Sequence, residues 1–391
     1  MLHKKSYKEV AMEKRRIEGM KVIFTATEIN EAVMNVSNVL LSGHLIKGLY
    51  SDEFAGRIAA RCGKDYAALF SSDTAAMEML FKALRVEGRY VAFQGNMFPS
   101  PVFACMRAGG KPLYVDIEFG YLGMSIDSLL EEIEGKDVAA VVMMHTAGII
   151  CRQTKEIVQI CKDRGIVLIE DCAHAYGSSF WTSPTFAPIG AGNLGDFAVF
   201  SFYATKPMNC GEGGAIAANA NRLDILSEVE SLARYGKEEI FGPPWCELPG
   251  YSNRMTEILC AVGVVADKYL DLKIRRRQEI AEVYNQHLIA TGSLYGLLVG
   301  LNYYKYVIMP GQSPFDRAKF KSRMKSEYDI GIPSGVYDFP VYAQPPLIST
   351  TSRIFENTKV FCKNHICLPM HEGLSNDDAI YVAEAAKEVL K

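Results

Sequence analysis

A lysine that follows an apolar segment is the residue of this chain best suited to covalent chemistry. Lys206 lies five residues after Ser201 and shortly before a glycine-rich turn at 210–214. Its amine can form a Schiff base with an aldehyde cofactor, while a serine hydroxyl holds the phosphate of that cofactor. Ordinary surface lysines are far more common, so Lys206 alone also fits a solvated side chain. Other segments must decide between these interpretations.

A carboxylate closes a second apolar run, at Val167-Leu168-Ile169-Glu170-Asp171. Asp171 can cap a following helix, which is the common role of an aspartate in this position. It can also bind the protonated nitrogen of a pyridine ring and so keep that ring an effective electron sink. His174, three residues further on, can point at the same cofactor, although an isolated histidine is more often structural.

A third segment is suited to hold a phosphate. Ser72, Asp73 and Thr74 follow an apolar run and open a helical pattern. Free N–H groups at a helix N-terminus, together with hydroxyl groups, form a natural phosphate site, but the same residues also make an ordinary helix cap. The carboxylate of Asp73 would repel the anion unless it points away. Phe98 is a candidate ring to stack on a flat cofactor, with a core position as its alternative.

Two other patterns suggest sites that their context does not support. Residues 190–195 match G-x-G-x-x-G, but they precede an apolar run instead of leading from a strand into a helix. We interpret them as a turn and not as a dinucleotide site. Cys362, His365 and Cys367 lie close in sequence without a second pair of ligands, so core and loop positions are favoured over a metal site. We expect no metal.

The elements that must position these residues follow from the apolar pattern. Strands are predicted at 66–70, 90–93, 112–116, 138–145, 166–171, 197–202 and 215–218. Helices are predicted at 74–84, 100–108, 126–133 and 154–163. This alternation predicts an α/β domain with a mostly parallel seven-stranded sheet between helices. Ligands bind at the carboxyl ends of such strands, where we expect His145, Asp171 and Ser201.

A different pattern follows after about residue 255. A long helical stretch at 255–288 precedes a strand at 303–309, a helix at 316–326, a short strand at 365–369 and an amphipathic helix at 376–390. These elements predict a smaller α+β C-terminal domain. We therefore expect an N-terminal arm and helix (1–40), a large cofactor-binding domain (41–250) and a small domain (251–391).

Composition excludes some classes of protein. The 391 residues are 49% hydrophobic and 22% charged, with a formal net charge of −3. This balance is typical of a globular protein and gives no electrostatic reason to expect binding to nucleic acid or membranes. The basic N-terminus reads as a solvated arm. Ten scattered cysteines without a C-x-x-C pair indicate buried thiols in a reducing cytoplasm.

Taken in order, these segments resemble the DegT/StrS-type sugar aminotransferases, which are fold-type I pyridoxal-phosphate enzymes with an aspartate-aminotransferase-like fold. The similarity runs from about residue 42 to the C-terminus and is most specific at 170–175 and 201–214. The resemblance implies that Lys206 binds pyridoxal 5′-phosphate and transfers protons. It also implies that Asp171 holds the ring nitrogen and His174 the oxygen side of the ring.

The resemblance further implies a phosphate site, substrates and a partner. Ser72, Asp73, Thr74 and Ser201 would hold the phosphate, with Phe98 over the ring. A further contact from the neighbouring subunit maps onto 250–255, with Asn253 as the candidate, so a homodimer is implied. The implied reaction moves an amino group from glutamate or glutamine to a keto sugar. The resemblance points to nucleotide-linked sugars of polysaccharide biosynthesis.

The chain departs from the family pattern at three positions. Asp73 replaces a glycine, Ser252 stands where the cross-subunit asparagine is usual, and Tyr342 stands where a histidine is common. Substrates such as a cyclitol or another small ketone therefore remain alternatives. So does a sugar dehydratase, although relatives with that activity carry histidine at the place of Lys206. The non-enzymatic alternative is a regulatory protein with vestigial cofactor binding.

Overall fold

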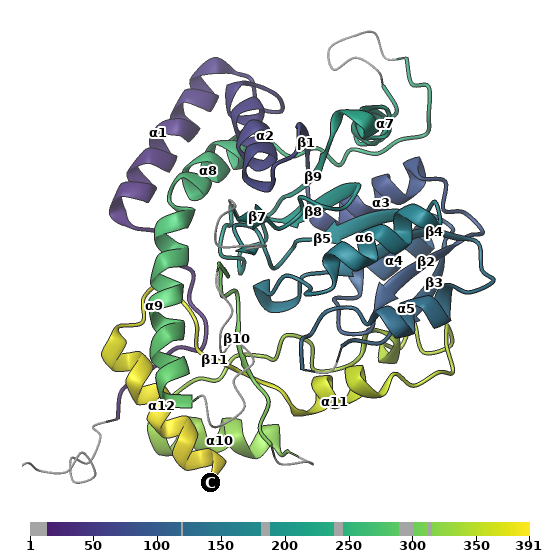
Figure 1. The fold of residues 1–391 in the computed structure, drawn as a ribbon. Helices are drawn as coiled ribbons and strands as arrows, with labels where there is room; N and C mark the ends of the chain where they lie inside the picture. Colours follow the sequence, from purple (N-terminus) through teal and green to yellow (C-terminus); the bar gives the residue numbers. More distant parts are fainter. Residues whose placement is uncertain (1–13, 119, 181–187, 238–244, 289–299, 312–314) are drawn as a thin grey trace, which may run out of the picture.

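A seven-stranded sheet forms the centre of the molecule in the computed structural model (Figure 1). The structure describes residues 14–118, 120–180, 188–237, 245–288, 300–311 and 315–391. The strands of the sheet are β1 (Tyr66–Phe70), β2 (Tyr90–Gln94), β3 (Lys111–Val115), β4 (Val138–Met144), β5 (Val167–Asp171), β8 (Phe197–Ser201) and β9 (Gly214–Ala218). Their order is β1-β9-β8-β5-β4-β2-β3.

The sheet is parallel except at β9, which runs antiparallel to both β1 and β8. Strands β4, β8 and β9 are buried along their whole length, as expected for strands covered by helices on both faces. Because β4, β5 and β8 are parallel, their carboxyl ends meet at one edge of the sheet. The sequence prediction of a mostly parallel seven-stranded sheet is confirmed.

Helices cover the two faces of this sheet. They are α2 (Leu49–Cys62), α3 (Asp73–Ala83), α4 (Ser100–Arg107), α5 (Ile126–Ile133), α6 (Thr154–Asp163), α7 (Leu223–Leu232) and α8 (Glu257–Lys268), while α1 (Ala26–Ser42) packs against α8. Apolar residues of α3, α4 and α7 form one core with the sheet, whereas α2 with α8, and α5 with α6, form two cores on the opposite face. The short strands β6 (Ser179–Phe180) and β7 (Ile189–Gly190) pair beside the sheet.

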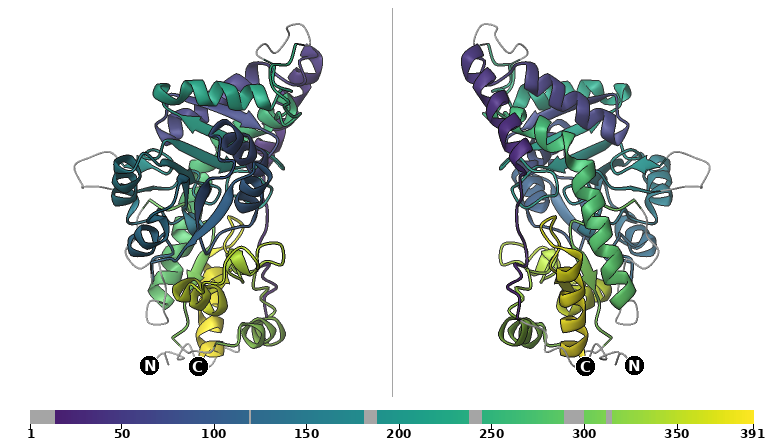
Figure 2. Two further views of the ribbon diagram at one scale, coloured as in Figure 1. Left: turned by 90° about the vertical axis from the view of Figure 1, so that its right-hand side faces the viewer. Right: turned by 90° about the vertical axis from the view of Figure 1, so that its left-hand side faces the viewer.

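The smaller C-terminal part contains α9 (Leu270–Leu288), β10 (Tyr306–Ile308), α10 (Arg317–Tyr328), α11 (Glu356–Asn364), β11 (Ile366–Leu368) and α12 (Asn376–Leu390). Strands β10 and β11 pair antiparallel, and α12 packs against α9. Figures 1 and 2 show α9 running from the sheet-containing part to the small part. The helical stretch predicted at 255–288 is two helices, which meet at Tyr269.

The described residues of the predicted arm, 14–16, are exposed, but the chain packs against the small part from Ile17 onward. Ile17 forms a bridge to Ile330, and its carbonyl accepts a hydrogen bond of 2.8 Å from the N–H of Gly331. Lys14 donates from Nζ to the carbonyl of Ser326 at 2.9 Å. Residues 14–24 therefore lie along the small part before the chain enters α1. Residues 1–13 lie outside the described residues.

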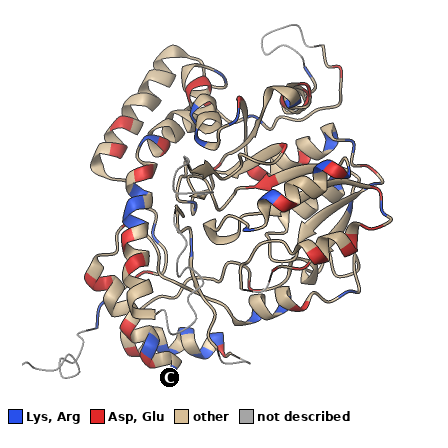
Figure 3. Cartoon of the chain, in the orientation of Figure 1, with Lys and Arg blue, Asp and Glu red and all other residues tan. Residues whose placement is uncertain are grey.

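Charges and thiols follow the expected pattern with one exception. On the side drawn in Figure 3, both basic and acidic residues lie on the outer surface of the helices. All the cysteines are free, and all but Cys246 are buried. Cys246 is exposed, which corrects the prediction of uniformly buried thiols. Within the described residues, no helix is both long enough and apolar enough to cross a membrane.

Candidate active site

A cavity of about 850 Å³ lies at the carboxyl ends of the strands, between the sheet and the small part. All the site residues predicted from the sequence, except Asn253, line it. They are Ser72, Asp73, Thr74, Phe98, Asp171, His174, Ser201 and Lys206. These residues belong to four chain segments that each follow or end a strand, namely β1, β2, β5 and β8. Its position is the usual ligand site of parallel sheets.

Lys206 lies in a tight turn after β8. Its backbone N–H donates to the carbonyl of Tyr203 at 2.9 Å. Its Nζ atom lies 4.9 Å from the centre of the Tyr304 ring, and no described residue forms an ion pair with it. The amine is therefore available for covalent chemistry with a group in the cavity.

Asp171 ends the central strand β5 and is only 2% exposed. Its Oδ1 atom accepts a hydrogen bond of 3.0 Å from the N–H of Ala173. Burial raises the pKa of this carboxyl group, while the Ala173 N–H and the positive charge of Lys206 act in the opposite direction. A bound N–H cation would remove that burial cost by pairing with the carboxylate. The geometry therefore suits a partner for a protonated ring nitrogen.

His174 is held in one orientation by the protein. Its Nδ1 atom accepts a hydrogen bond of 3.2 Å from the N–H of Ala147, so the ring proton resides on Nε2. Nε2 lies 3.3 Å from the hydroxyl oxygen of Tyr337. The imidazole also lies between two aromatic rings, with its centre 4.3 Å from that of Tyr304 and 5.6 Å from that of Tyr337. The side chain is thus fixed before any ligand enters.

The electrostatic surroundings keep His174 neutral. Burial, and then the positive charges of Lys206 and Lys305, lower its pKa well below the ordinary value. The imidazole therefore acts as a hydrogen-bond donor through Nε2 and not as a cation. The same two lysines affect Tyr304, because they outweigh burial and lower the pKa of its hydroxyl group.

The turn before α3 forms the candidate phosphate site. The hydroxyl of Ser72 accepts a hydrogen bond of 3.1 Å from the N–H of Ala75, so its role as a helix cap is observed directly. Gly214 pairs with Ser201 across the sheet, and a Cβ atom on this glycine would lie 2.5 Å from the carbonyl carbon of Ser72. Only glycine therefore lets the turn pack beside Ser201. This arrangement brings Thr74 and Ser201 to the same cavity.

Several residues that line the cavity are not apparent from the sequence motifs. Tyr337 belongs to the small part. It ends the loop 331–337, which lines the cavity and contains no catalytic motif. Gly19 and Met20 come from the N-terminal segment. Tyr304 and Lys305 of the small part also line the cavity, whereas none of residues 245–251 does.

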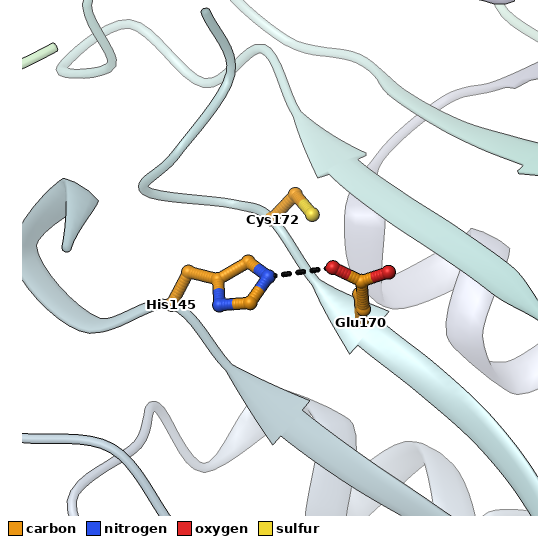
Figure 4. Close-up of side chains that lie close together, drawn as sticks. All are labelled: His145, Glu170 and Cys172. Atoms are coloured by element: carbon orange, nitrogen blue, oxygen red, sulfur yellow. Dashed lines mark hydrogen bonds and ion pairs between the residues drawn. The ribbon is translucent and has the colours of Figure 1, made fainter. Parts of the chain in front are cut away.

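The G-x-G-x-x-G segment binds a carboxylate of the protein itself. The N–H groups of Gly192 and Gly195 donate to Glu170 at 3.0 and 2.5 Å. Figure 4 shows the third partner, His145, whose Nε2 atom lies 2.8 Å from Glu170 Oε2. Because the Cys151 N–H donates to His145 Nδ1, the imidazole donates to Glu170 through Nε2. The segment is therefore a structural turn, as the sequence context indicated.

His145, Glu170 and Cys172 lie close enough together to suggest a metal site. Both ring nitrogens of His145 already have protein partners, and both oxygens of Glu170 accept backbone hydrogen bonds. Burial raises the pKa of Cys172 well above its ordinary value, so the thiolate that a metal requires is disfavoured. These residues connect β4, β5 and the turn before β8 behind Asp171. They do not form a ligand set.

Asn253 lies outside the cavity of its own chain. Its backbone carbonyl accepts a hydrogen bond of 2.8 Å from the N–H of Ser71, and its N–H donates to the carbonyl of Ala233. The neighbouring Ser252 hydroxyl accepts from Arg254 at 2.8 Å. The segment thus runs along the outside of the turn that leads into α3. A role of Asn253 in the site of a second subunit stays a prediction.

Comparisons with known proteins find similar sequences over most of the chain. The sequence model of the DegT/DnrJ/EryC1/StrS aminotransferase family matches residues 26–387. The spore coat polysaccharide biosynthesis protein SpsC of Bacillus subtilis (strain 168) is 28% identical over 382 residues, which cover 92% of this chain and 95% of that protein. GDP-perosamine synthase of Escherichia coli O157:H7 is 26% identical over 347 residues, with coverage of 88% and 90%.

A solved structure shows the same fold. Spr1654 from Streptococcus pneumoniae, in its PMP form, superposes with a TM-score of 0.86 at 22% sequence identity. The superposition covers 96% of this chain and 98% of that chain. The likeness therefore extends over both the sheet-containing part and the small part.

Proposed function

This chain belongs to the DegT/DnrJ/EryC1/StrS aminotransferase family, and we propose that it moves an amino group from glutamate or glutamine to a nucleotide-linked keto sugar with pyridoxal phosphate as cofactor. One observation carries this proposal. The Lys206 amine, without an ion-pair partner among the described residues, shares a large cavity with the strand-end carboxylate of Asp171. The relative named GDP-perosamine synthase supports a nucleotide-linked sugar, and the PMP form of Spr1654 supports the cofactor.

The residues present fit this cofactor. Asp171 would hold the ring nitrogen, His174 would contact the oxygen side of the ring, and Phe98 is 59% exposed in the cavity wall, where it would cover a flat ring. Thr74 and Ser201 would hold the phosphate at the N-terminus of α3, where backbone N–H groups have no partner within the helix. When bound, pyridoxal phosphate supplies an aldehyde that links to amines and a ring that withdraws electrons from the attached carbon.

Lys206 would move the proton in both halves of the reaction. In the first half its Nζ atom would take the proton from the α-carbon of the amino-acid donor and deliver it to the cofactor carbon, and in the second half it would carry a proton from that carbon to the sugar carbon that receives the amine. The Tyr304 ring, 4.9 Å from Nζ, would stabilise the ammonium form that exists between the two proton transfers of each half. Tyr337 and His174 form an ordered wall that excludes water from the far side of the cavity.

We also propose a homodimer. The surface of α1 and the segment leading into α2 carries large apolar side chains that are more than 40% exposed. They include Val33, Met34, Leu40, Leu41, Ile46 and Leu49. Contiguous exposed apolar surface of this kind is typical of a protein interface. A second copy of this chain is the occupant that the predicted cross-subunit role of Asn253 requires.

The lysine supports amino transfer over the alternatives. Sugar dehydratases that resemble this chain carry histidine in its place, whereas a regulator with vestigial binding has no need for an amine held in the cavity. No feature of the site favours either alternative. The acceptor sugar and the choice of glutamate or glutamine belong to the proposal and must be determined by assay.

The test combines covalent trapping with turnover. Borohydride reduction of the protein with pyridoxal phosphate should fix the cofactor on the peptide that contains Lys206, as read by peptide mass spectrometry. Added glutamate should then convert the cofactor absorption of unreduced protein, and a keto sugar nucleotide should restore it. Lys206→Ala should lose both the adduct and the conversion. An adduct on another lysine, or unchanged amino transfer by Lys206→Ala, would refute the proposal.

A further inference from the structure

One residue of the candidate phosphate site has an unexpected chemical character. Asp73 is the first residue of α3, where the resemblance leads one to expect a glycine, and it lines the cavity with Ser72 and Thr74. An ionised carboxylate in this place would repel a phosphate dianion. A carboxylic acid that keeps its proton would instead offer a hydrogen-bond donor. The surroundings of Asp73 decide between these two forms.

The surroundings of Asp73 offer little that would stabilise a negative charge on its side chain. The residue is 9% exposed, and its Oδ1 atom is buried without a hydrogen-bond partner. Among the residues that the structure describes, no donor reaches either carboxyl oxygen. Asp171 is different, because the N–H of Ala173 donates to it. A buried carboxylate without donors is costly, and protonation removes most of that cost.

On balance, the charged groups around Asp73 also favour its protonated form. Burial, and then the carboxylate of Asp171 at the end of β5, raise the pKa of Asp73 well above its ordinary value, and only Lys206 after β8 opposes them. The hydroxyl of Tyr337, from the small part, also lies within electrostatic range.

We propose that Asp73 is a neutral carboxylic acid in the filled site and donates a hydrogen bond to the phosphate of the cofactor. This inference rests on the proposed function, because it assumes that a phosphorylated pyridine binds in the cavity. It assigns to the side chain a role that a glycine cannot perform. The site would then bind phosphate through one proton that it must retain, so affinity would fall once alkaline pH removes that proton.

Three matched proteins test this inference without relying on turnover. Wild type, Asp73→Asn and Asp73→Ala are prepared without cofactor, and their affinities for pyridoxine 5′-phosphate and for pyridoxine are measured by calorimetry at pH 7.5. Neither probe carries an aldehyde, so Schiff-base formation does not contribute. Asparagine keeps the size and a donor but has no charge, whereas alanine removes both. Thermal melting verifies that each variant is folded.

The expected result is a selective loss in one variant. Wild type and Asp73→Asn should bind pyridoxine 5′-phosphate within about threefold of each other, and Asp73→Ala should bind it roughly tenfold more weakly, as for the loss of one hydrogen bond to a charged group. Affinity for pyridoxine should change little. Raising the pH should weaken the wild type relative to Asp73→Asn, by up to tenfold per pH unit above the pKa of Asp73.

Two results would overturn the inference. If Asp73→Asn binds the phosphorylated probe at least tenfold more tightly than wild type, Asp73 is an ionised and repulsive group. If the three proteins bind it equally, the side chain does not contact the phosphate. Asp127→Asn is the matched control, because Asp127 is also in the first turn of a helix capped by serine but lies exposed and outside the cavity. Failure of all proteins to bind the probe would instead count against the proposed function.

Discussion

At the scale of single residues, the site separates charges that would otherwise neutralise one another. Lys206 and Asp171 line the same cavity, yet they do not form an ion pair. Tyr304 holds the amine by its ring face, and the Ala173 N–H holds one oxygen of the carboxylate. Each charge is therefore left available to a ligand. A site in which Lys206 and Asp171 bonded directly would have to break that pair before binding a cofactor.

Asp171→Asn should reduce amino transfer by about 100-fold or more, because a neutral amide cannot keep a pyridine nitrogen protonated and the electron sink is weakened. The adduct on Lys206 should still form. The two quantities are measured separately, by steady-state rate with a keto sugar nucleotide and by the absorption of the bound cofactor. A variant with a rate near that of wild type would show that Asp171 does not hold the ring nitrogen.

At the scale of elements, a buried histidine fixes the loop that carries Tyr337. The His365 Nε2 atom accepts a hydrogen bond of 2.8 Å from the N–H of Val336, while Nδ1 donates to the carbonyl of Phe361 at 2.8 Å. The imidazole stacks on the ring of Phe361 at 4.2 Å. Both nitrogens are thus used in structure, which explains why the neighbouring Cys362 and Cys367 form no metal site with His365.

This bond should make stability depend on pH. Burial lowers the pKa of His365 from 6.5 to about 4. Between these values the unfolded chain binds a proton that the folded chain does not, so stability should fall as the pH falls from 6.5. The loss should be about 3 kcal/mol by pH 4. Urea unfolding at pH 7, 5.5 and 4.5 measures it.

The matched variants for this prediction are His365→Gln and His44→Gln. Glutamine at 365 can still accept from the Val336 N–H but does not titrate, so the decline in stability with acid should become shallower. His44 is exposed, and its replacement should leave the decline unchanged. Equal pH profiles for wild type and His365→Gln would contradict the assignment of this bond.

At the scale of the whole molecule, the cavity is closed by segments far apart in sequence. The sheet supplies Asp171 and Lys206, the small part supplies Tyr304 and Tyr337, and the N-terminal segment supplies Met20. Movement of the small part relative to the sheet would therefore change the cavity wall. The exposed apolar surface on α1 and before α2 lies outside this arrangement and is the surface that the proposed second copy of the chain would cover.

A mixed dimer tests the predicted sharing of sites. Lys206→Ala and Asn253→Ala should each be poorly active, because each lacks one component of every site. When the two variants are unfolded and refolded together in equal amounts, mixed dimers should contain one intact site. Activity should recover to roughly one quarter of the wild-type value, since half of the dimers are mixed and each has one of two sites.

The refolded single variants are the controls for this experiment. Recovery well above their combined activity supports a site shared across the subunit interface. No recovery, with dimers demonstrated by light scattering, would show that Asn253 acts within its own chain or does not contribute. The same experiment with Ser252→Ala distinguishes between the two neighbouring candidates for the contact.

The amino-acid sequence by itself determined the sheet and the strand-end chemistry. Apolar runs of strand length located the strands, and the parallel arrangement required Asp171 and Ser201 to meet at one edge. These features depend on local periodicity and on the direction of the chain, both of which can be read along the sequence. The same reading missed the packing of residues 14–24 on the small part, since nothing local distinguishes that segment from a solvated arm.

Only the tertiary structure determined which residues from distant segments line the cavity. Tyr337 contacts His174 although the two residues are 163 positions apart in the sequence, and no motif around Tyr337 indicates that contact. The charge state favoured at Asp73 likewise depends on the proximity of Asp171 and on the absence of a donor among the described residues. Burial and electrostatic proximity are properties of the folded arrangement. Residue type and spacing can nominate the groups that react, but their surroundings determine which proton each group holds.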